Sequence, residues 1–92
     1  MSNIIEDIII DIHFLENELQ KYEKKYGIIS ELFYKLYNAG VLEEDWDFQE
    51  WSGYFEAYQY RKKRFTKFIS TDSVSRLLIN KDRQKEVMEL IK

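Results

Sequence analysis

Apolar and aromatic residues recur at alternating steps of three and four along the stretch 45–69. This stripe consists of Phe48, Trp51, Phe55, Tyr58, Lys62, Phe65 and Ile69. Such spacing places its members on one face of a helix. Asp45 or Asp47 is the candidate N-cap. The pattern predicts a long helix over about 47–69, whose aromatic face organises the fold.

The N-terminal part of the chain shows the same alternation over three heptads. Its stripe runs through Ile5, Ile8, Ile12, Leu15, Leu19, Tyr22 and Tyr26. Ser2 or Asn3 is the expected cap, and Gly27 can end the helix in a left-handed conformation. We therefore predict a helix over about 3–26 that packs on another helix in a coiled-coil-like manner.

Two shorter patterns predict further helices, over about 30–39 and 73–91. Ser30 is the expected N-cap of the first of these, and Gly40 ends it. Its expected inward face consists of Leu32, Phe33, Leu36 and Tyr37. In the acidic connector that follows, the residues expected to pack on the core are Val41 and Leu42, with Trp46 as a further candidate.

The fold class predicted from these patterns is all-α, a bundle of about four helices. No strand-like alternation of useful length appears in the sequence. With 92 residues the chain is expected to form a single helical domain over 1–92. The long first and third helices would pack through their heptad-like stripes.

Composition and one interrupted apolar run bear on the compartment. The chain has no cysteine, which excludes disulfides, thiolate metal sites and cysteine nucleophiles. Acidic residues interrupt the apolar run 4–12, and no basic segment precedes it. Neither a signal peptide nor a membrane span fits this run. We therefore expect a cytoplasmic protein that does not bind a membrane.

Candidate catalytic chemistry is sparse. His13 is the only histidine, and neighbouring residues supply neither a triad nor a zinc site. Asp45, Asp47 and Glu50 lack the further ligands and the correctly placed glycine of a calcium loop. There is no phosphate-binding glycine-rich loop. We predict no catalytic residue, metal site, cofactor or small-molecule substrate, and hence a protein that is not an enzyme.

Charge is distributed unevenly along the chain. Residues 1–60 carry 13 acidic against 4 basic residues, whereas residues 61–92 carry 10 basic against 4 acidic ones. Basic residues interleaved with aromatic ones are typical of nucleic-acid binding, although cations also stabilise a helix C-terminus. The candidate phosphate contacts are Arg61, Lys63, Arg64, Lys67, Arg76 and Arg83. A small nucleic-acid-binding protein is therefore an alternative interpretation.

Residues 25–58 contain a run of aromatic, glycine and acidic positions. These positions are Tyr26-Gly27, Ser30, Phe33-Tyr34, Gly40, Asp45, Asp47, Glu50-Trp51 and Tyr54. In this region the chain resembles a group of small prokaryotic helical proteins that are themselves similar to antitoxins of toxin–antitoxin pairs. The resemblance implies binding to a protein rather than catalysis.

A second apolar patch on the first helix supports the same interpretation. At 100° per residue, Ile10 and Phe14 lie about 120–160° from the centre of the main stripe. One core cannot bury both sides of a surface helix, so Ile10 and Phe14 are candidate partner-binding residues. Lys62 interrupts an apolar stripe. Either its stem lies along the core while its ammonium reaches water, or the stripe faces a partner there, which makes Lys62 a third candidate. We predict a protein-interaction or regulatory module that binds a partner protein or forms a homodimer.

Overall fold

The computed structural model describes residues 4–69, which form three helices joined by two short connections. The helices are α1 (Ile4–Tyr26), α2 (Ser30–Asn38) and α3 (Trp46–Phe68). The described part of the chain is all-helical, as predicted, and each bound lies within one residue of its predicted position. The fourth predicted helix, 73–91, falls outside the described residues.

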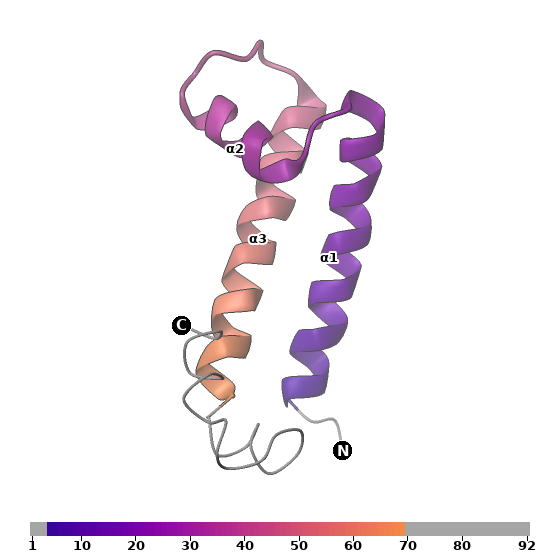
Figure 1. Ribbon diagram of the computed structural model, residues 1–92, viewed down its shortest axis with the longest axis vertical. Coiled ribbons are helices and arrows are strands. Elements are labelled where there is room, and N and C mark those ends of the chain that lie inside the picture. The colour runs from indigo at the N-terminus through magenta and orange to yellow at the C-terminus, as the bar shows by residue number, and fades with distance from the viewer. Residues whose placement is uncertain (1–3, 70–92) are drawn as a thin grey trace, which may run out of the picture.

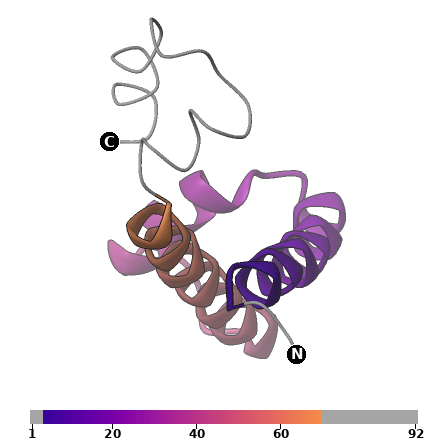
Figure 2. The same ribbon diagram turned by 90° about the horizontal axis from the view of Figure 1, so that it is seen from below.

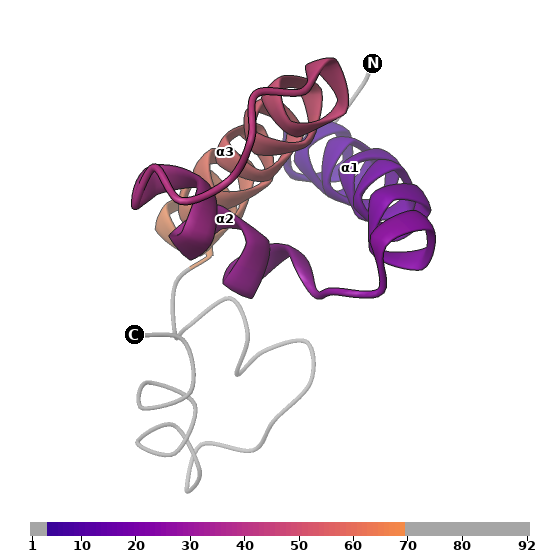
Figure 3. The same cartoon turned by 90° about the horizontal axis from the view of Figure 1, so that it is seen from above.

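The two long helices run antiparallel and lie side by side along their lengths (Figure 1). α2 crosses one end of this pair, next to the C-terminal end of α1 and the N-terminal end of α3. Views along the long axis from both ends show α2 on one side of the α1–α3 pair (Figures 2 and 3). The side of α1 that faces away from α3 is covered by no described helix.

Local signals explain where these helices begin and end. Gly27 and Gly40 follow α1 and α2 with φ angles of 71° and 74°, which side chains with a Cβ rarely adopt. Asp45 caps α3, and its side chain accepts a hydrogen bond from the backbone N–H of Asp47. Of the two predicted caps for this helix, Asp45 is therefore the correct one.

The core lies where the three helices meet. It consists of Leu19, Phe33, Trp51 and Phe55, one or two residues from each helix. The Trp51 indole stacks on the Phe33 ring, with centroids 3.7 Å apart and planes inclined by 4°. The Tyr22 and Tyr26 rings of α1 also stack with this indole, at 5.6 and 5.7 Å. The aromatic face of α3 thus organises the core, as its spacing predicted.

Ser30 does not cap α2, which corrects the sequence prediction. The N-cap residue is Ile29, and it makes no side-chain capping bond. Ser30 is buried instead, and its hydroxyl accepts a hydrogen bond from the Trp51 indole N–H at 2.9 Å. The same hydroxyl donates to a Glu23 carboxylate oxygen at 2.7 Å. These bonds connect all three helices.

Three residues predicted to pack inward are exposed, namely Leu32, Val41 and Trp46. Leu32 lies about 130° around α2 from the face that carries Ser30 and Phe33, because each residue turns the helix by 100°. Trp46 is the first residue of α3 and lies about 140° from Trp51 by the same period. The prediction holds for Phe33, which is buried, and for Leu42, which packs against the core.

Candidate protein-interaction surface

α1 presents opposite faces to the core and to solvent. Its buried residues are Ile8, Leu15 and Leu19, which pack toward α3. On the far side, Ile10 and Phe14 retain 64% and 55% of their surface. Large apolar side chains this exposed, one helical turn apart, form a contiguous patch. The exposure expected from the sequence is thus present in the structure.

Further exposed residues extend this patch along α1. At 100° per residue, Asp7, Ile10, Phe14, Asn17 and Lys21 fall within about 80° of one another, and all five are exposed. Their spacing alternates between three and four, as in the contact seam of a coiled coil. We call these five residues the outer face of α1. His13 lies beside it and is also exposed.

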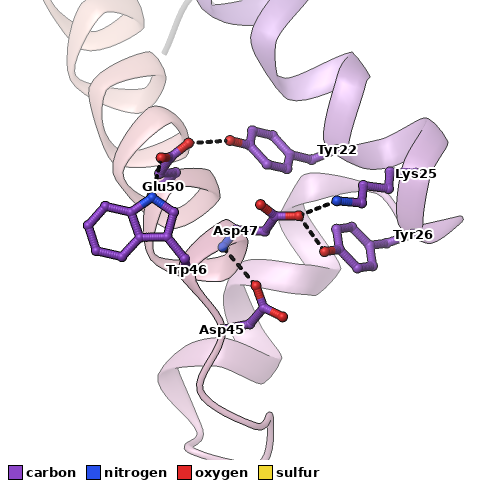
Figure 4. A network of polar contacts seen from close by, with 7 residues as sticks. All are labelled: Tyr22, Lys25, Tyr26, Asp45, Trp46, Asp47 and Glu50. Atoms are coloured by element: carbon purple, nitrogen blue, oxygen red, sulfur yellow. Dashed lines mark hydrogen bonds and ion pairs between the residues drawn. The ribbon is translucent and has the colours of Figure 1, made fainter.

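Polar contacts at the C-terminal end of α1 fix the rotation of this helix against α3 (Figure 4). The Lys25 ammonium and the Tyr26 hydroxyl both donate to Asp47 Oδ2, at 2.6 and 2.5 Å. The Tyr22 hydroxyl donates to Glu50 Oε2 at 2.8 Å, and the Trp46 indole N–H donates to the other oxygen of that carboxylate. Because these side chains hold one face of α1 against α3, the outer face points away from the core.

The same contacts shift the titration of the groups involved. Hydrogen bonds from Lys25 and Tyr26 hold the pKa of Asp47 below its ordinary value of 3.8. The contact with Asp47 in turn raises the pKa of Lys25 above 10.5. Burial, followed by the hydrogen bond to Glu50, raises the pKa of the Tyr22 hydroxyl. At neutral pH Asp47 and Lys25 are therefore charged, and the Tyr22 hydroxyl keeps its proton.

Acid should weaken the Asp47 contacts. The folded-state pKa of Asp47 is depressed, so its contribution to stability is present above 3.8 and is lost as the pH falls through the lower folded-state value. We expect the Tm difference between the wild type and Asp47→Asn to narrow as the pH is lowered from about 5 to about 2. Thermal melts followed by circular dichroism measure this difference. A Tm difference that stays constant over this pH range would show that the charge of Asp47 does not contribute to stability.

Lys62 does not lie with Ile10 and Phe14, although all three were predicted to bind a partner. It is exposed on α3, and its ammonium lies 4.8 Å from the centroid of the Tyr58 ring. This geometry agrees with a lysine whose charged end reaches water while its stem lies on an aromatic ring. Lys62 therefore belongs to the basic end of α3, away from the outer face of α1.

The basic residues of α3 are only partly available for phosphate. Arg61 Nε lies 3.3 Å from Asp11 Oδ2 on α1, and the Arg64 guanidinium lies over the Phe68 ring. Lys63 and Lys67 are exposed, and within residues 4–69 neither forms an ion pair. With Gln59, Lys62 and Thr66 they line a surface hollow. Arg76 and Arg83 fall outside the described residues.

Sequence reasoning missed the network that joins the helices. Spacing within one helix predicts none of these contacts, because each joins residues of two different helices. Lys25 and Asp47 are 22 residues apart in the sequence, and Ser30 and Trp51 are 21 apart. Glu23 and Ser30 are seven apart, across the connection between α1 and α2. The available signal was the acidic start of α3, which could have been matched with lysines at the end of α1.

Within residues 4–69, no three histidine, cysteine or acidic side chains are grouped so that they could hold a metal ion. None of the described helices is both long and apolar enough to cross a membrane. No protein-family model, curated protein or solved structure matches the chain.

Proposed function

We propose that this protein is a protein-interaction module and that the outer face of α1 is its binding surface. The observation that carries the proposal is the exposure of Ile10 and Phe14 on the side of α1 opposite the core. Exposed apolar residues that form a patch on a helix are typical of protein interfaces. A helix with 3–4 spacing on both faces can pack on its own core and on a second protein at once.

The proposed role is that of a non-catalytic regulatory subunit. The resemblance of residues 25–58 to antitoxin-like proteins supports this role, because antitoxins act by binding a protein. The rigid attachment of α1 to α3 supports it as well, since it holds Ile10 and Phe14 in a fixed orientation before binding. A surface that is already ordered loses less conformational entropy when a partner binds.

Glutamate substitutions at the patch test the proposal. Ile10→Glu combined with Phe14→Glu should abolish recovery of a partner, or of an untagged second copy, by the tagged protein, because it places two charges in an apolar contact. Leu32→Glu with Val41→Glu is the matched control, since it changes two exposed apolar residues away from α1. Pull-down from native host cells and light scattering of the purified protein are the measurements.

Equal recovery with the patch variant and the wild type would contradict the proposal. Far-UV circular dichroism should show the same helical signal for both variants, because all four substituted side chains are exposed. An unfolded patch variant would instead assign Ile10 and Phe14 to the core of the chain.

Nucleic-acid binding is the second candidate function, and the exposure of Lys63 and Lys67 favours it. The affinity for nucleic acid falls as salt rises, with a steeper slope of log K against log salt for more phosphate contacts. If these lysines contact phosphates, Lys63→Glu with Lys67→Glu should make this slope shallower by about 2. Gel shifts with a short duplex and a single strand, at low and moderate salt, measure this slope. Lys24→Glu with Lys35→Glu is a control of equal charge change, and a slope reduced equally by both variants would reject a specific contact.

A further inference from the structure

The outer face of α1 has opposite charges at its two ends. Asp7 lies before Ile10, and Lys21 lies after Phe14 on the same face. At one edge of this face Glu6 and Lys24 share one direction, because 18 residues complete five turns of an α-helix. All four charged residues are exposed. The apolar pair is thus flanked by an acidic end and a basic end.

These charges are largely unused within the molecule. Among residues 4–69, no ion pair involves Glu6, Asp7 or Lys24, and Lys21 contacts only Glu18 of its own helix. By contrast, two other charged residues of α1 form ion pairs with α3, Asp11 with Arg61 and Lys25 with Asp47. Glu6, Asp7 and Lys24 therefore remain available to pair with a second protein.

We propose that the partner of the outer face is a second copy of this chain, with the two α1 helices antiparallel about a two-fold axis near Phe14. This inference rests on the proposed function and names its partner. In that arrangement Asp7 lies opposite Lys21 of the partner subunit. Glu6 lies about 3 Å along the helix axis from the level of Lys24 of the partner subunit, which the long lysine side chain can span. Two-fold symmetry forms each pair twice. The Phe14 side chains meet at the axis, with Ile10 beside them.

Charge decides the orientation. A parallel pair about a two-fold axis would place each residue opposite its own copy, so that acid faces acid at one end and base faces base at the other. Such like-charge contacts disfavour an assembly, whereas the antiparallel pair brings opposite charges together at both ends. The 3–4 spacing of the face allows either orientation, so the distribution of charge selects the antiparallel one.

Single cysteines test this arrangement, because the chain contains none of its own. Position 7 of one copy would lie opposite position 21 of the other, whereas two copies of position 21 would be about 21 Å apart. A disulfide needs Cα atoms within about 7 Å. An oxidised mixture of Asp7→Cys and Lys21→Cys chains should therefore yield a mixed disulfide dimer. Each variant oxidised alone should yield at least about tenfold less dimer.

The opposite pattern overturns the proposal. Efficient disulfide formation by either variant alone would indicate a parallel pair, and no disulfide in the mixture at high protein concentration would remove the second copy as the partner. Adding Ile10→Glu and Phe14→Glu to both chains should abolish the mixed disulfide. Retention of the disulfide in that background would show that the chains meet elsewhere.

Salt dependence of the wild-type dimer is an independent measurement that needs no substitution. Attractive ion pairs between exposed charges are screened by salt, so the dimer Kd should rise by several-fold between low and moderate NaCl. A Kd that falls over this range would contradict facing opposite charges. If the wild type is monomeric while Ile10→Glu with Phe14→Glu still abolishes capture of another protein, the second copy is rejected and the proposed function stands.

Discussion

Replacing Trp51 by alanine is expected to lower the free energy of unfolding by about 3–5 kcal/mol. The Trp51 side chain is fully buried, and its indole stacks with rings from both other helices. The substitution removes the largest buried side chain and also leaves Ser30 without the indole N–H that it accepts from. Urea unfolding followed by circular dichroism measures the change. A domain of this size is marginally stable, so the variant should be substantially unfolded at 37 °C.

The second tryptophan provides the matched control. Trp46 retains 70% of its surface, and its indole N–H donates to Glu50 at the start of α3. Trp46→Ala removes the same atoms from an exposed position, so its cost should stay below about 1 kcal/mol. Similar losses for the two variants would contradict the core described here. A loss of less than about 1 kcal/mol for Trp51→Ala would also contradict a core centred on Trp51.

Replacing Glu23 by alanine should destabilise the protein by about 1.5–3 kcal/mol, the usual contribution of hydrogen bonds to a charged group. One oxygen of this carboxylate accepts from both the backbone N–H and the hydroxyl of Ser30, at 2.9 and 2.7 Å. It therefore binds the N-terminus of α2, where no side chain of the N-cap residue does so. Without Glu23, α2 loses its polar attachment to α1.

A double-mutant cycle separates this contact from general effects. Glu23→Ala, Ser30→Ala and the double variant should give an interaction energy of about 0.5–3 kcal/mol, because the two side chains contact each other directly. Glu18→Ala is the control, since the surface ion pair of Glu18 with Lys21 is worth less than about 0.5 kcal/mol. Additive losses would show that Glu23 stabilises the fold without its contact to Ser30.

The sequence by itself determined the helices of the described region. Local features decide where a helix starts and stops. In this chain they are the 3–4 stripes of α1 and α3, the left-handed glycines Gly27 and Gly40, and the Asp45 cap. The stripe of α1 also predicted its buried residues, because helical period fixes which side chains share a face. Ile10 and Phe14 could be assigned to the opposite side for the same reason.

Only the tertiary structure decided which parts of these faces are covered. α2 buries Ser30 and Phe33, so Leu32 on its other side is exposed although it is apolar, and Val41 in the connection after α2 is exposed as well. Ser30 could have capped α2, but the burial of Trp51 required an acceptor for its indole N–H, and the Ser30 hydroxyl supplies it. The exposure of Ile10 and Phe14 likewise depends on α2 packing beside the α1–α3 pair, since no pattern within one helix specifies which of its faces the others leave uncovered.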